Sequence, residues 1–172
     1  LDEPALTRES IHLGKAARVD KSRVVYQDFC RSVLPRGMDL SGLKIVIDCA
    51  NGAGYKVGPR VLADLGAEII PIGCSPNGRN INLRCGSTAP ELLQATVSGV
   101  RADVGIALDG DGDRLVMVDH LGRVADGDQL LYVIASDRKR ANALQGPVVG
   151  TVMSNLGLEQ QLRAEGIEFL RA

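Results

Sequence analysis

The sequence predicts an α/β fold with a mixed, mostly parallel sheet that is flanked by helices and has an antiparallel edge strand. Short apolar runs typical of strands alternate with segments of helical periodicity, and the first connections are long enough for right-handed parallel crossovers. By contrast, the strand-like runs at 104–108 and 115–119 are joined directly by a short acidic loop. A connection of that length favours an antiparallel pair.

Composition limits the classes of function. The chain has 172 residues, of which 45% are hydrophobic and 24% are charged, so it can bury a core. Its net charge is −1, only 3% of its residues are aromatic and no basic stripe is visible, so nucleic-acid binding is not expected. Apolar runs stay well below the roughly 18 residues of a membrane span. The first residues lack Met and do not resemble a signal peptide, which favours an excised or processed piece.

The first elements follow from local patterns. Residues 1–18 are polar and mixed in charge, and we interpret them as a linker or the end of a preceding element. Asp20 is expected to cap a helix over about residues 21–34, which Pro35 and Gly37 should end.

A glycine-rich turn follows the strand expected at 43–48 and leads into a helical pattern. Gly52 and Gly54 match the start of a dinucleotide-binding fingerprint, but Val57 stands at the third glycine position. The next strand, 68–72, does not end in the acid that such a site requires. A tight turn is therefore favoured over nucleotide binding.

The segment after that strand is rich in turn residues. In the loop at 75–82 and just beyond it, Arg79 and Arg84 are interpreted as solvated side chains rather than ligand contacts. Thr88 and Glu91 are expected to form a capping box at the start of a helix.

The last third of the chain repeats the α/β pattern. Asp126 and Gln129 are expected to cap a helix that runs to about residue 141, and Gly146 and Pro147 break the chain. The elements expected next are a strand at 148–151, a helix at 156–164 capped by Ser154 or Asn155, and a strand starting at 168–170.

These elements divide the chain into three parts. Residues 1–18 are assigned to a linker or the end of a preceding domain, and residues 19–145 to one α/β domain. Residues 146–172 look like the first βα unit of another domain, because they have no partners of their own.

The acidic loop is the strongest candidate for a functional site. Asp109, Asp111 and Asp113 alternate with Gly110 and Gly112. On an extended strand the carboxylates would be about 6.6 Å apart from one to the next, so the backbone must curl to bring them to one ion. Glycine permits the conformations that such a curl needs. Carboxylate oxygens suit Mg²⁺ or Ca²⁺ better than a soft metal.

The residues around the loop narrow its interpretation. An EF-hand fits poorly, because its sixth position would be Arg114 and its twelfth His120. Arg114 is permanently charged and has a planar fork suited to phosphate, so a cation beside it would equip the loop to hold a phosphoryl group. The simpler alternatives are an acidic surface turn and a calcium loop without chemistry.

Cysteines and histidines indicate no second metal centre. Cys30, Cys49, Cys74 and Cys85 lack CxxC spacing and are interpreted as free thiols in a reducing cytosol, rather than as a zinc site. The two histidines are too few for a His-rich centre, and His120 is expected to lie in a hairpin turn.

With these motifs placed, the chain resembles the α-D-phosphohexomutase superfamily, and within it the bacterial phosphoglucosamine mutase branch. The resemblance covers nearly all of the sequence. It rests on five segments: 46–53 (VIDCANGA), 76–82 (PNGRNIN), 109–114 (DGDGDR), 124–129 (VADGDQ) and 149–159 (VGTVMSNLGLE).

The resemblance implies a cytoplasmic enzyme of four domains around one cleft, with this chain as domain 2, a tail of domain 1 and the start of domain 3. Asp109, Asp111 and Asp113 match the three Mg²⁺ ligands, and Arg114 matches a catalytic arginine that faces the active site. A phosphoserine of domain 1 would interconvert glucosamine 6-phosphate and glucosamine 1-phosphate through a bisphosphate. The product leads to UDP-N-acetylglucosamine and cell-wall precursors.

The sequence also lacks parts of the family pattern. It contains no Thr-Ala-Ser-His-Asn-Pro-like segment for the phosphoserine, no domain 3 sugar-binding loop and no domain 4 phosphate-binding loop. We therefore expect the chain alone to be inactive. The alternatives are a phosphomannomutase or phosphoglucomutase, a non-catalytic module that binds a divalent metal, and a dinucleotide-binding domain, which the incomplete glycine pattern weakens.

Overall fold

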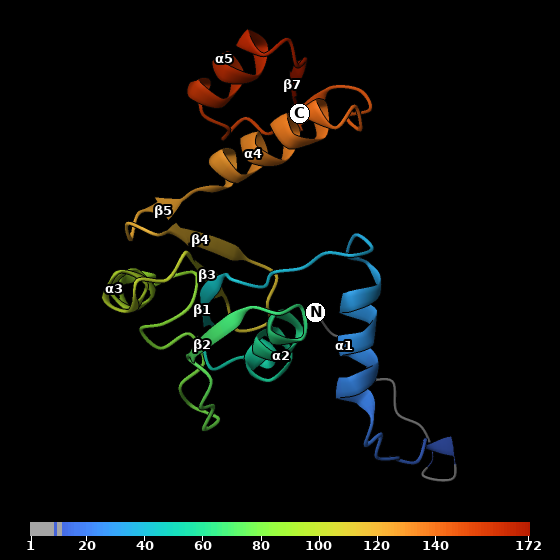
Figure 1. The fold of residues 1–172 in the computed structure, drawn as a ribbon. Helices are drawn as coiled ribbons and strands as arrows, with labels where there is room; N and C mark the ends of the chain where they lie inside the picture. The colour runs from blue at the N-terminus through green and yellow to red at the C-terminus, as the bar shows by residue number, and fades with distance from the viewer. Residues whose placement is uncertain (1–8, 10–11) are drawn as a thin grey trace, which may run out of the picture.

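The computed structural model describes residue 9 and residues 12–172, and its centre is a five-stranded sheet in the order β2-β1-β3-β4-β5 (Figure 1). Strands β1 (Lys44–Asp48), β2 (Glu68–Ile72) and β3 (Val104–Leu108) are parallel. Strands β4 (Leu115–Asp119) and β5 (Val124–Ala125) continue the sheet in antiparallel pairing. The predicted mixed, mostly parallel sheet with an antiparallel edge is confirmed, and the edge consists of two strands.

Helices cover both faces of the sheet. Successive residues of a strand point to opposite faces, so Val46 packs in the core beneath helix α3 (Glu91–Val100), whereas Ile47 lies against helix α2 (Val57–Asp64). A short 3₁₀ turn (Ala53–Tyr55) precedes α2. The core on the α3 side consists of Val46, Leu93, Val97, Ala102, Ala107 and Val118. Burial on both faces explains why β1 is apolar from Ile45 to Ile47 without alternation.

Two of the expected helix caps are wrong. Helix α1 (Ser22–Ser32) forms where expected, but its N-cap is Lys21, and Asp20 instead forms an exposed ion pair with Arg18. Helix α3 starts after Pro90 without a side-chain cap, so Thr88 and Glu91 form no capping box. In both cases the chain reaches the helix with helical or nearly helical dihedrals, which leaves no extended residue to turn its side chain back onto the first turn.

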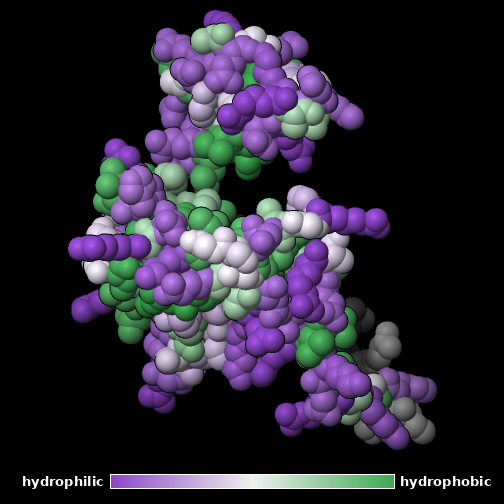
Figure 2. Space-filling view, in the orientation of Figure 1, coloured by the Kyte–Doolittle hydropathy of each residue, from purple (hydrophilic) through white to green (hydrophobic). Residues whose placement is uncertain are grey.

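A second, smaller unit follows the sheet, and the face of it that Figure 2 shows is mainly hydrophilic. It contains helix α4 (Gly127–Arg140), helix α5 (Leu156–Ala164) and a parallel pair of strands, β6 (Val148–Gly150) and β7 (Phe169–Arg171). Its core residues are Ala135, Val148, Leu158, Leu162 and Ile167.

Helix α4 lies with this second core, in contrast to the expected boundary after residue 145. Its buried Ala135 packs among residues of α5 and β6, with Leu131 and Tyr132 at the edge of the same cluster. The hydrophobic periodicity of the helix predicts an apolar face but does not show which core that face packs against. We therefore propose a boundary close to Asp126, where the chain leaves β5.

The caps in this unit form as expected. The Asp126 carboxylate accepts from the Gln129 backbone N–H at 2.8 Å, and the Gln129 side chain accepts from the Asp126 N–H at 2.9 Å. At α5 the cap is Asn155 rather than Ser154, and its side chain accepts from the Leu158 N–H at 2.8 Å. Both helices are thus anchored at their N-termini by side chains.

Replacing Asp126 by Ala removes one side of this capping box. We expect Asp126→Ala to lower the free energy of unfolding by about 1 kcal/mol, the usual cost of a lost N-cap. Urea denaturation followed by circular dichroism measures this. Asp20→Ala is the matched control and should have little effect, since Asp20 caps nothing; equal losses in the two variants would contradict the assignment.

Glu165, which follows α5, connects that helix to α4. Its carboxylate accepts hydrogen bonds from the hydroxyl of Tyr132 and from the hydroxyl of Ser136, the latter at 2.9 Å. These bonds, that of Tyr132 first, lower the pKa of Glu165 below its ordinary value of 4.5. The ionised form is therefore favoured in the folded state.

This lowered pKa predicts a dependence of stability on pH. The contribution of Glu165 is complete above its ordinary pKa of 4.5 and is lost as the pH falls through the lower pKa of the folded state. Glu165→Gln should therefore flatten the loss of thermal stability below about pH 4.5. Melting temperatures across pH 3 to 7 test this. Glu168→Gln, at an exposed glutamate of the same unit, is the control and should keep the slope of the unmodified chain.

Candidate metal centre

The loop between β3 and β4 brings three carboxylates together. One oxygen each of Asp109, Asp111 and Asp113 can be chosen such that all three lie within 4.8 Å of one another. Oxygen ligands of Ca²⁺ lie about 2.3 to 2.6 Å from the ion and can be up to about 5 Å apart, so the spacing fits one ion of that size. Around Mg²⁺, with oxygens at about 2.1 Å, the same carboxylates would lie within about 4.2 Å of one another. The donors are all hard oxygens, which also suits these ions.

The curl of the loop depends on Asp109. Its side chain is only 1% exposed, and its Oδ1 accepts the backbone N–H groups of Gly112 and Arg114, both at 3.1 Å. Gly112 has a φ of +80°, a left-handed conformation that glycine adopts without steric cost. Asp111 and Asp113 point outward and are exposed. One buried carboxylate therefore shapes the loop that presents the other two.

Arg114 neutralises part of the charge in the loop. Its Nε lies 2.8 Å from Asp109 Oδ2 and 3.7 Å from Asp113 Oδ1, while its side chain remains 65% exposed. The Arg114 backbone N–H and guanidinium together lower the pKa of Asp109 to about 2. The hydrogen bond with Asp109 and the charge of Asp111 raise the pKa of Asp113. The loop therefore holds Asp109, which is ionised at neutral pH, beside Asp113, whose charge a cation would stabilise.

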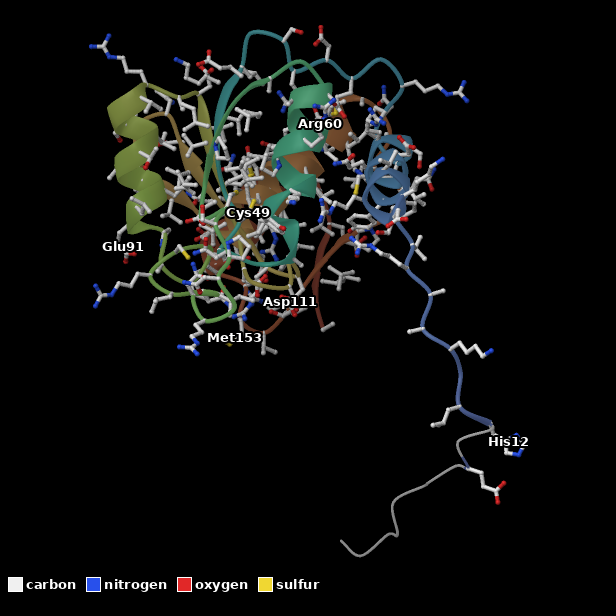
Figure 3. All side chains as sticks on the ribbon, turned by 90° about the horizontal axis from the view of Figure 1, so that it is seen from below. His12, Cys49, Arg60, Glu91, Asp111 and Met153 are labelled. Atoms are coloured by element: carbon white, nitrogen blue, oxygen red, sulfur yellow. The ribbon has the colours of Figure 1, made fainter. Side chains whose placement is uncertain are left out.

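The glycine-rich turn after β1 supports this loop. Ala53 N–H donates to the Gly110 carbonyl at 2.8 Å, and a Cβ on Gly52 would lie only 2.2 Å from that oxygen. In Figure 3 the labelled Asp111 lies below Cys49, the residue that follows β1. The glycines thus permit two backbone segments to touch, a role that the spacing of glycines alone did not reveal.

The loop at 75–88 covers the other side of Gly110. A Cβ on Gly110 would lie 2.5 Å from Ile81 Cδ1 and 2.9 Å from Asn82 Nδ2. Arg79 and Arg84 are exposed in this loop, in agreement with the interpretation of solvated side chains. Gly110 is thus enclosed between two loops that lie far from it in the sequence.

The remaining candidates lie as follows. The cysteines are free, and Cys49 and Cys85 are buried. His120 lies in the turn in which Gly122 N–H donates to the Asp119 carbonyl at 2.9 Å, as expected. In the part of the chain that the structure describes, no helix is long and apolar enough to cross a membrane.

Two family models match the chain. Residues 26–122 match the phosphoglucomutase/phosphomannomutase alpha/beta/alpha domain II, and residues 126–172 match domain III of the same family. The match to domain III starts at the residue where α4 is capped, which agrees with the packing of α4 in the second unit.

Relatives and solved structures are similar over most of the chain. The phosphoglucosamine mutases of Chromobacterium violaceum and Photorhabdus laumondii are 54% and 53% identical over all 172 residues. The chain spans 39% of the length of each of these relatives. A phosphoglucomutase/phosphomannomutase family protein from Burkholderia thailandensis superposes with a TM-score of 0.70 at 26% identity, over 87% of this chain and 32% of that one. An N-acetylglucosamine-phosphate mutase shares the fold, with a TM-score of 0.60 at 17% identity over 88% of this chain and 32% of that one.

The sheet order, the helices on both of its faces and the acidic loop thus occur in a sequence that matches family domains along most of its length. The predicted resemblance is confirmed. The chain belongs to the phosphoglucomutase/phosphomannomutase family.

Proposed function

We propose that the chain is the metal-binding part of a phosphoglucosamine mutase, which interconverts glucosamine 6-phosphate and glucosamine 1-phosphate. The observation that carries the proposal is the convergence of Asp109, Asp111 and Asp113 at the carboxyl end of β3. The identity of 54% to a phosphoglucosamine mutase, over every residue of the chain, supports this branch of the family. A phosphomannomutase or phosphoglucomutase is the second candidate, because the matching family models describe both.

The three aspartates would hold Mg²⁺, which neutralises phosphate charge and favours in-line transfer when it is bound. Asp109 would act as the buried ligand that is ionised at neutral pH, and the exposed Asp111 and Asp113 would complete the face toward the ion. Arg114 would bind a phosphoryl oxygen, since its Nε holds Asp109 while most of its side chain is free to meet a ligand.

The rest of the reaction would depend on other domains of the parent protein. The phosphoserine, the sugar-binding loop and the phosphate-binding loop would come from domains 1, 3 and 4, which explains why we expect this chain alone to be inactive. The cytoplasm, where glucosamine phosphate is converted towards UDP-N-acetylglucosamine, is the proposed location. A non-catalytic metal-binding module remains the alternative of another class.

The metal assignment predicts a specific loss of binding. Calorimetric titration should show saturable Mg²⁺ binding to the unmodified chain and at least about tenfold weaker binding to Asp111→Asn, because one charged ligand becomes neutral. Asp137→Asn removes the same charge from an exposed site on α4 and should leave the affinity unchanged. Equal affinities for Asp111→Asn and the unmodified chain would contradict the site, and a preference for Ca²⁺ would favour the non-catalytic module.

The role of Arg114 predicts a loss of activity in the full-length parent enzyme. Arg114→Lys keeps the positive charge but removes the planar fork, so kcat/KM for glucosamine phosphate should fall by about tenfold or more. Arg138→Lys, on the exposed surface of α4, is the control. An Arg114→Lys enzyme with unchanged kcat/KM would exclude a direct role for the guanidinium.

A further inference from the structure

A second buried carboxylate lies on the strand next to β3, which leads into the acidic loop. Asp48, the last residue of β1, has no exposed surface, and among the described residues only Asp109 is a comparably buried carboxylate. Burial of a carboxylate is costly unless hydrogen bonds replace its water. Asp48 Oδ1 accepts the Ala50 N–H at 2.9 Å, and Oδ2 accepts the Gly86 N–H at 2.7 Å. Each oxygen therefore holds a different loop.

The Ala50 branch leads to Gly110. Ala50 has a φ of +51°, a left-handed conformation that is unfavourable for a residue with a Cβ and persists only where neighbouring groups hold it. Its carbonyl accepts the Asn82 N–H at 2.9 Å, and Asn82 lies against Gly110. The same turn reaches Gly110 directly through the Ala53 N–H. The hydrogen bond that Asp48 accepts from the Ala50 N–H thus fixes the turn that contacts Gly110 from two directions.

The Gly86 branch leads to the residue before Asp109. Ser87, next to Gly86, donates its N–H to the Leu108 carbonyl at 2.9 Å. A Cβ on Gly86 would lie 2.5 Å from that same oxygen, so only glycine permits the approach. Asp48 therefore holds the loop that fixes Leu108, and with it the point where the acidic loop begins.

We propose that Asp48 is a positioning residue of the metal centre. Through Ala50 it fixes Gly110, and through Gly86 it fixes Leu108, the two residues on either side of Asp109. This inference rests on the proposed metal site and adds a residue that contacts neither metal nor substrate. Asp48→Asn keeps the shape of the side chain but replaces one acceptor by an NH₂ group that faces an N–H donor. One branch should then be released while Asp109, Asp111 and Asp113 remain intact.

The test is a Mn²⁺ titration followed by electron paramagnetic resonance, which reports free and bound ion separately. Asp48→Asn should bind Mn²⁺ about tenfold or more weakly than the unmodified chain, a loss typical of groups that orient metal ligands. Asp103→Asn is the matched control: Asp103 Oδ2 accepts the Lys44 N–H at 2.7 Å, at the opposite end of β1. The affinity of the Asp103→Asn chain for Mn²⁺ should not change, and urea denaturation of both variants identifies any general loss of stability.

The outcomes separate this inference from the proposed function. A folded Asp48→Asn chain that binds Mn²⁺ as tightly as the unmodified chain overturns the positioning role and leaves the metal site in place. Absence of saturable binding to the unmodified chain overturns the metal site, and the positioning role with it.

A second measurement covers the case in which Asp48→Asn does not fold. Coupling is reciprocal, so Mg²⁺ bound to the unmodified chain must stabilise the two branches. Hydrogen exchange of the Ala50, Gly86 and Ser87 amides should slow on addition of Mg²⁺, whereas that of the Lys44 amide should not. Unchanged exchange at all of these amides would overturn the inference.

Discussion

The acidic loop depends on the buried carboxylate of Asp109 and on the hydrogen-bond donors that satisfy it. Three aspartates in five residues repel one another, and a loop of this composition would extend without a compensating charge. The N–H groups of Gly112 and Arg114 and the Arg114 guanidinium all reach Asp109. The repulsion among the three carboxylates is thus partly offset within the loop itself, and Asp111 and Asp113 remain exposed.

The sheet decides where this loop lies. Strands β1, β2 and β3 are parallel, so the segments that follow them all leave the sheet at the carboxyl ends of these strands. There the turn after β1 contacts Gly110, and the segment before α3 contacts the carbonyl of Leu108. Fold and site are therefore linked by backbone contacts in which glycines approach other chain segments more closely than a Cβ would allow.

Local sequence patterns predicted where the helices and strands lie better than they predicted which residues cap the helices and which core each helix packs against. The apolar runs of β1 and β3 and the capping box of Asp126 depend on neighbours in sequence, and the structure reproduces them. Asp20 and Thr88 have the residue types of helix caps, yet neither caps a helix, because cap formation also needs an extended backbone before the first turn. The position of α4 was missed for a related reason: amphipathicity shows that a helix packs, but not against which core.

The fold class, the family resemblance and the cluster of aspartates at 109, 111 and 113 could be predicted without coordinates, because strand periodicity and the alternation of Asp with Gly are local properties of the chain. The burial of Asp48, the contact of Gly52 with Gly110 and the contact of Gly86 with Leu108 became visible only in the tertiary structure. Those contacts join segments some 20 to 60 residues apart, and they follow from the parallel register of β1 and β3, which no short stretch of sequence encodes.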